Sequence, residues 1–221
     1  MLKNASVETT PTAKTPMVTL GITKAITNLT EAHTRLGIAP SPDATFFMEW
    51  KAPLPPLTDT EKARLDHLKQ RYLHYADSGA ITEGTVNLIL LSPLLETLGF
   101  IDPPYQVRGE KYVRFEIEDG DTLLDGLIDA LVIHDRLWLI VIESKRYGFS
   151  VRQAIAQTLA YTVGAPISPV FALITTGEDY LFVKCDRDAA HYALSDKFTL
   201  STAEGNELYT VAQILKQLVS V

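Results

Sequence analysis

The segment LIDALVIHDRLWLIVIESK, residues 127–145, holds two apolar runs joined by a short polar connection. Both runs are apolar at consecutive positions, which is typical of strands covered on both faces in the middle of a sheet. Three charged residues interrupt them: Asp129 in the first run, and Glu143 and Lys145 at the end of the second. A buried charge without a partner is costly. We therefore expect these three side chains to meet.

Strand geometry allows this meeting. Glu143 and Lys145 share a face because side chains alternate along a strand. If the chain turns about Asp135, Asp129 lies opposite Val141 and diagonal to Glu143, on the same face. Diagonal neighbours are about 7–8 Å apart, which lets two carboxylates bind one ion. A one-residue change in pairing would move Asp129 to the other face, so this is a definite prediction of register.

Two simpler interpretations stay open. Glu143 and Lys145 can form an internal ion pair without any ligand, although that leaves Asp129 unexplained. Asp125 is a rival to Asp129, since it lies four residues earlier on the same face. Its place near the start of the strand is one where a solvated carboxylate is more ordinary, so we favour Asp129.

Two converging carboxylates beside an ammonium group suit a hard divalent cation. Mg²⁺ takes one or two carboxylates together with waters and phosphate oxygens, and Mn²⁺ can replace it. Such an ion polarises a phosphoryl oxygen and lowers the pKa of bound water. Lys145 would hold that water or stabilise developing negative charge. These groups predict hydrolysis of a phosphodiester bond.

The rest of the chain predicts helices on both sides of these strands. Residues 1–16 are expected to be disordered, 17–37 to form a helix, and the aromatic, Pro-rich segment 46–57 to pack as an extended arm. The expected elements that follow are a helix from a capping box at Thr58, a helix over 82–99 kinked near Ser92, strands 112–118, 124–134 and 137–145, a helix over 150–163, strands 170–175 and 180–184, and a helix over 209–219. This order predicts an α/β fold with a mixed sheet flanked by helices. We divide it into an N-terminal tail, helix and arm (1–57) and a main domain (58–221).

Composition limits the function classes. The formal net charge of the 221 residues is −7, whereas proteins that hold nucleic acid by overall electrostatics are usually basic. A nucleic-acid role must therefore depend on a local site. The single cysteine, Cys185, excludes an internal disulfide and Cys-rich metal sites, and indicates a cytoplasmic compartment. The apolar runs are far shorter than the ~18 residues of a spanning helix, and the N-terminus lacks the apolar region of a signal peptide.

These motifs resemble a known family. Asp129 with Glu143-Ser144-Lys145 in the next strand resembles the PD-(D/E)xK nuclease motif, here without a Pro before the Asp. Gln157 and Tyr161 in the following helix resemble the Q-x-x-x-Y motif of the RecB-like branch. The segment SPLLETLGF at 92–100 and the turn at Gly177 are similar to the N-terminal nuclease domain of type I restriction enzyme R subunits, and residues 46–75 look like its stand-alone bacterial homologues.

The resemblance implies a restriction-endonuclease-like fold, a DNA substrate and a Mg²⁺ cofactor. Asp129 and Glu143 would be metal ligands and Lys145 the catalytic lysine, while Glu83 would be a further acid that binds or orients the metal. Gln157 would touch the substrate or the water, with Tyr161 one turn further on the same helical face. Separately, Arg146 and Arg152 are neighbours of the site and candidates for phosphate contacts.

The same residues leave rival functions open. A binding module would keep the fold and hold nucleic acid or a partner without cutting it. An assembly protein would use the aromatic arm to pack across a second subunit. A homodimer is compatible with each function, because cutting both strands of a duplex is simplest with two sites. The chain has no G-x-x-x-x-G-K-[ST] loop, so we expect no ATP-binding motor in it.

Overall fold

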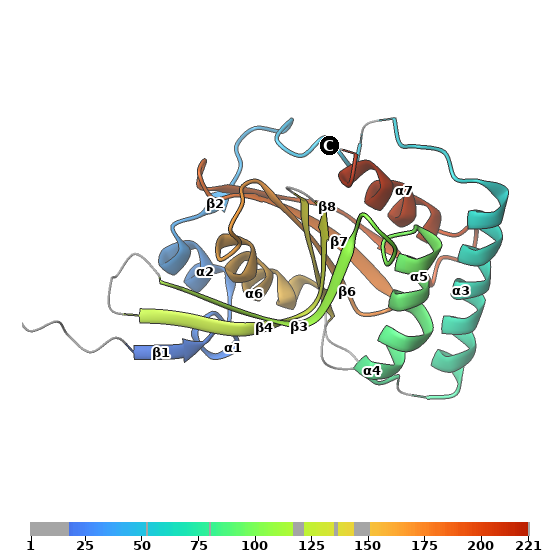
Figure 1. Ribbon diagram of the computed structural model, residues 1–221, viewed down its shortest axis with the longest axis horizontal. Helices are drawn as coiled ribbons and strands as arrows, with labels where there is room; N and C mark the ends of the chain where they lie inside the picture. Colours follow the sequence, from blue (N-terminus) through green and yellow to red (C-terminus); the bar gives the residue numbers. More distant parts are fainter. Residues whose placement is uncertain are drawn as a thin grey trace, which may run out of the picture.

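Figure 1 shows the computed structural model, in which one mixed β-sheet separates two groups of helices. The structure describes residues 18–51, 53–79, 81–116, 122–134, 137–143 and 151–220. Within these ranges, the side chains of 129–131, 133, 134, 137–143 and 151–153 lie outside the description. An α/β fold with a mixed sheet flanked by helices is therefore confirmed.

The described elements follow one another in a mixed order. The strands are β1 (Val18–Gly21), β2 (Ala39–Pro40), β3 (Gln106–Glu116), β4 (Thr122–His134), β5 (Leu137–Glu143), β6 (Val170–Thr175), β7 (Asp179–Asp186) and β8 (His191–Thr199). The helices are α1 (Ile22–Ala25), α2 (Leu29–Leu36), α3 (Asp59–Asp77), α4 (Glu83–Val86), the π-helical turn η1 (Asn87–Leu91), α5 (Ser92–Thr97), α6 (Val151–Val163) and α7 (Leu208–Leu218).

The sheet has the order β1-β4-β5-β6-β7-β8-β2, and β3 pairs with β4 outside this path. Pairing is antiparallel from β3 through β4 to β5, and again from β6 through β7 to β8. It is parallel for β1 with β4, β5 with β6 and β2 with β8. The longest strand, β4, therefore has three strand neighbours and forms the junction of the sheet.

Each face of the sheet has its own apolar core. The first core joins α1, α2 and α6 to one face and includes Leu124 and Ile128 of β4. The second joins α3, α4, α5 and α7 to the other face and includes Val132 of β4 (Figure 1). Strand β6 is buried along its whole length because both cores cover it.

The N-terminal segment differs from the single helix predicted over 17–37. Residues Val18–Gly21 pair with β4, α1 is one turn long, and α2 begins after Asn28, whose side chain accepts a hydrogen bond from the Glu31 amide. This N-cap starts a new helix in place of continuing the first. Strand pairing with residues about a hundred positions away overrides local helix periodicity here. Strands β1, β2 and β8 were not predicted.

The helix containing Ser92 has a π-helical turn where a kink was expected. Pro93 has no N–H to donate to the carbonyl of Ile89 four residues earlier. Arg71 from α3 donates to that carbonyl instead, at 3.0 Å. The turn 87–91 widens the helix just before the proline, so α4, η1 and α5 follow without a break in the chain.

The aromatic arm packs on its own chain. Phe47 is buried in the second core, and Lys184 of β7 donates to the Phe46 carbonyl at 2.8 Å. At the far end of the arm, Gln213 of α7 donates to the Pro55 carbonyl at 2.9 Å, and the capping box of Thr58 begins α3 as predicted. The expectation that this segment packs onto the protein is confirmed, and its docking in cis weakens the idea of an arm reaching across to a second subunit.

Candidate active site at a split in the sheet

The predicted acids lie on neighbouring strands. Asp129 is in β4, and Glu143 is the last residue of β5. The backbone of both is described, and their side chains lie outside the description. Lys145 and Arg146 lie outside the described residues altogether, and Arg152 is described only as part of α6.

The edge of β4 that carries β5 is shared between two strands. Residues Thr122–Asp125 pair with β1, and residues Ala130–His134 pair with β5. Between these ladders, positions 126–129 have no partner on this edge among the described strands. Strand β5 nevertheless continues along β6 to the pair of Glu143 with Thr175. The two strands thus separate at the end that carries Asp129 and Glu143, which leaves a split in the sheet.

The pairing register differs from the prediction by one residue. Ala130, and not Asp129, lies opposite Val141. The pair nearest the connection is His134 with Leu137, so two residues separate the strands, whereas a turn about Asp135 would pair His134 with residue 136. Loop length fixes hairpin register, and the polar connection 134–136 did not reveal that length.

A second irregularity lies beside Asp129. Ile128 belongs to the core on the α6 face and Val132 to the core on the opposite face. Residues four apart in a regular strand share a face, so the alternation of β4 reverses between them. Across the ladder, Glu110 has φ 49°, a left-handed conformation that is uncommon for a residue other than glycine. In a regular ladder the observed register would place Asp129 on the face opposite Glu143, which contradicts the predicted convergence. The reversal of alternation lies next to Asp129, so register alone does not fix the face of its side chain.

The helix that starts at Glu83 lies close to the split. Gly177, in the turn after β6, has φ 86°, and a Cβ at this position would lie 2.9 Å from a methyl carbon of Val86. Thr175, two residues earlier, is the partner of Glu143. The fold therefore brings the start of α4, with the half-buried Glu83, to the same end of the sheet as the end of β5.

Tyr161 of α6 packs beneath the strand that carries Asp129. Its side chain is buried, and a Cβ added to Gly126 would lie 2.7 Å from the Tyr161 hydroxyl oxygen and 3.2 Å from Ile22 Cδ1. This packing favours a role in holding β4 over direct contact with a substrate. Gln157, one turn earlier on α6, is half-buried.

Asp125, the rival acid, has a local partner. The Tyr112 hydroxyl donates to Asp125 Oδ2 at 2.8 Å, and this hydrogen bond to a carboxylate raises the pKa of Tyr112. Arg114 lies opposite Asp125 in the β3–β4 ladder. The surroundings of Asp125 are those of a surface strand carboxylate.

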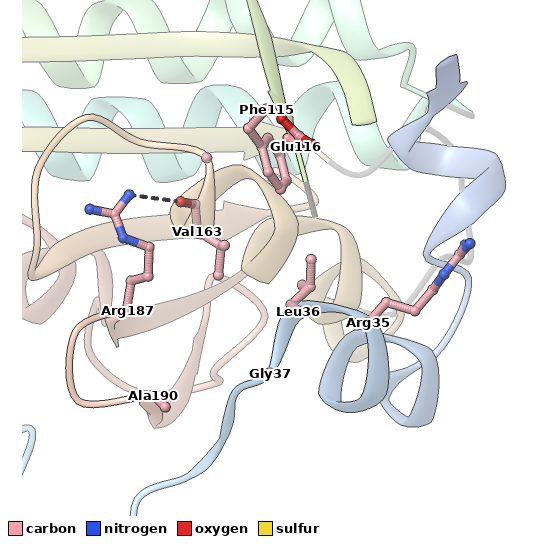
Figure 2. Close-up of a pocket in the computed structure, with 9 residues that line it drawn as sticks. Arg35, Leu36, Gly37, Phe115, Glu116, Val163, Arg187 and Ala190 are labelled. Carbon is pink, nitrogen blue, oxygen red and sulfur yellow. Dashed lines mark hydrogen bonds between the residues drawn. The ribbon is translucent and has the colours of Figure 1, made fainter. Parts of the chain in front are cut away.

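A pocket of about 280 Å³ lies at the other end of α6, and Figure 2 shows the residues that line it. It is lined by the C-terminal residues of α6, by Leu36 and by Phe115. Arg187 lines it as well, but its guanidinium donates to the carbonyls of Val163 at 3.2 Å and Ala165 at 2.9 Å, so it caps the helix end. This pocket is separate from the predicted site.

Comparisons with known proteins do not place the chain in a family. No protein-family model matches the sequence, and the search of curated proteins returns no significant match. Among the described side chains, no group of three or more His, Cys, Asp or Glu residues is placed to hold a metal ion, and Asp129 and Glu143 are not part of that set. No helix in the described part of the chain is long and apolar enough to cross a membrane.

Proposed function

We propose that the protein is a Mg²⁺-dependent nuclease with a restriction-endonuclease-like fold that hydrolyses phosphodiester bonds in DNA. The observation that carries the proposal is the split between β4 and β5 beside the positions of Asp129 and Glu143. Crevices where neighbouring strands of an α/β sheet diverge are common ligand sites. The start of α4, with Glu83, supplies a third acid near the same end.

The order of elements gives further support. The helical segment 83–97 is followed by three antiparallel strands, then by α6 and by β6, which runs parallel to β5. This is the order of helix and strands expected from the sequence. The left-handed backbone at Glu110, opposite Asp129, adds a local irregularity of the kind that gathers at functional sites.

The donor set fits a hard cation. Carboxylate oxygens of Asp129, Glu143 and Glu83 would hold Mg²⁺, which would polarise the phosphate and acidify its bound water. Lys145 would orient the attacking water and stabilise negative charge on the phosphate oxygens. Gln157 would position the substrate or the water, and Arg146 and Arg152 would bind flanking phosphates. The water oxygen would attack phosphorus as the water loses a proton, and the bond to the leaving oxygen would break as that oxygen takes up a proton from solvent.

The direct test is cleavage of plasmid and linear DNA by the purified full chain with Mg²⁺ or Mn²⁺. Asp129→Asn, Glu143→Gln and Lys145→Met are each expected to reduce cleavage by roughly 10²-fold or more. Asp125→Asn is the matched control, because it changes an acid on the same strand and is expected to keep activity. Melting curves check that each variant folds.

Two results would contradict the proposal. Wild-type protein that cleaves nothing with either metal, and that behaves like a variant combining all three substitutions, would remove the catalytic role. Loss of activity in Asp125→Asn together with full activity in Asp129→Asn would show that the site uses Asp125 and not Asp129. Binding of Mn²⁺ and DNA without turnover would favour the alternative, a catalytically silent nucleic-acid-binding module on the same fold.

A further inference from the structure

Strand β3 lies at an edge of the sheet formed by the described strands. It pairs with β4, and its other edge has no strand neighbour among the described residues. Its exposure is high along most of its length, and Tyr112 is 51% exposed. An unpaired edge presents a row of backbone N–H and C=O groups to any strand that can dock there.

Charges along this edge follow an unusual pattern. Alternate residues of β3 are Arg108, Glu110, Tyr112, Arg114 and Glu116. Around Tyr112 the pattern is self-complementary, because the residue two positions before it is acidic and the residue two positions after it is basic. The outer pair, Arg108 and Glu116, has opposite signs as well.

We propose that β3 pairs antiparallel with β3 of a second copy of this chain, across a two-fold axis at Tyr112. A two-fold dimer uses the same surface on both subunits. With the axis at Tyr112, Glu110 of each copy lies opposite Arg114 of the other, and the two tyrosines face each other. Opposite charges across a strand pair stabilise it, and like charges destabilise it.

Neighbouring registers lack this complementarity. An axis at Lys111 would place that lysine opposite its own copy, and an axis at Val113 would place Glu110 opposite Glu116. An axis at Glu110 or at Arg114 would place that residue opposite its own copy. The left-handed backbone at Glu110 ends the regular part of the strand, so the segment 110–114 is the part that would carry the ladder.

The proposed interface does not depend on nuclease activity, although it has a consequence for it. β3 is the direct neighbour of β4, which carries Asp129. The dimer would join the sheets of both copies into one continuous sheet, which would then contain the β4–β5 split of each copy. Two sites related by a two-fold axis match the symmetry of a DNA duplex.

Charge exchange tests the interface in the full chain without DNA. Sedimentation equilibrium over a concentration series is expected to show a dimer of the 24.5 kDa chain. Arg114→Glu, which faces Glu110 with a like charge, is expected to raise the dimer dissociation constant by at least about tenfold. The double variant Glu110→Arg with Arg114→Glu restores opposite charges and is expected to restore the dimer. Lys24→Glu, at an exposed position of α1, makes the same charge change away from β3 and is expected to have no effect.

Arg114 also donates to Thr19 Oγ1 at 3.2 Å within its own chain. Both Arg114 variants lose this bond, so recovery in the double variant separates the interface from a local effect on β1.

Cross-linking locates the axis. In an antiparallel pair, opposed Cα atoms lie about 4.5–5.5 Å apart, within the range of a disulfide. Tyr112→Cys is expected to form a covalent dimer on mild oxidation, and Cys185 is too buried to interfere. Leu127→Cys on β4 is the matched control, since Leu127 is 50% exposed and lies opposite Tyr112 on the next strand, so that both β3 strands would separate its two copies in the dimer. A protein that stays monomeric at every concentration would overturn the proposal. So would a dimer whose dissociation constant is the same in the charge variants and that gives no Tyr112→Cys cross-link.

Discussion

Substitution of Lys184 measures how much the contact between the aromatic arm and β7 contributes to the free energy of unfolding. The Lys184 ammonium lies 2.6 Å from Glu49 Oε1 and 5.1 Å from the centre of the Phe46 ring, and the two charged side chains are only 15% and 17% exposed. Glu49 Oε2 is buried without a hydrogen-bond partner. In Lys184→Met the carboxylate would remain buried and unpaired, which costs about 3–5 kcal/mol. Urea unfolding followed by tryptophan fluorescence would measure the loss, with Trp50 itself in the arm.

Two further variants separate the ion pair from general packing. Lys184→Met combined with Glu49→Leu removes both charges and is expected to regain most of the lost stability, because apolar replacement of a buried pair is often neutral or better. Lys197→Met breaks a pair with Asp179 at 3.0 Å whose side chains are 53% and 25% exposed, and should cost at most about 1 kcal/mol. A loss below about 1 kcal/mol in Lys184→Met would refute this account of the arm.

Three other predictions follow from single contacts. Gly126→Ala should destabilise the fold by about 1–3 kcal/mol through its contact with Tyr161, and Tyr161→Phe should relieve part of that cost in the double variant; additive effects in a double-mutant cycle would contradict the contact. Burial raises the pKa of Glu61, but hydrogen bonds from Lys216 and from the helix N-cap outweigh it and hold the pKa below 4.5. The stability that ionised Glu61 contributes is therefore complete above pH 4.5 and is lost as the pH falls through the lowered pKa. Lys216→Met should therefore make the urea concentration at the unfolding midpoint less dependent on pH in the acid range. Burial raises the pKa of Cys185 to about 11, so a thiol reagent at neutral pH should react only as fast as the chain unfolds, and rapid labelling of native protein would contradict this.

Local patterns predicted much of the fold. The two apolar runs within 127–145 predicted β4 and β5, because strands that are apolar on both sides lie in a sheet whose two faces are covered. The capping box at Thr58 gave the start of α3, because its groups are close in sequence. In contrast, β8 was missed because its alternation is broken. A register irregularity lies between Leu181 and Val183 of β7, and the buried Ser195 accepts a hydrogen bond from the Phe182 amide there.

The residues of the candidate site stay a prediction from the sequence, whereas the strand pairing around them could not be predicted. The split at 126–129 arises because β1, far away in sequence, takes one half of the β4 edge and β5 the other half. No pattern within the hairpin contains that information. The packing of Tyr161 against Gly126 is similarly non-local, since a tyrosine at helical spacing has the same signature whether it lies against a strand or a substrate.

The first two strands impose a delay on biosynthesis. Val18–Gly21 finds its partner only when the ribosome has released Thr122–Asp125, and Ala39–Pro40 only when His191 and Tyr192 have emerged. Until then the nascent N-terminus carries strand edges with nothing to pair. Pairings so distant in sequence form slowly and expose the chain to aggregation. Closure of this sheet therefore waits until residue 192 has left the ribosome, and chaperone dependence during expression would be its cellular signature.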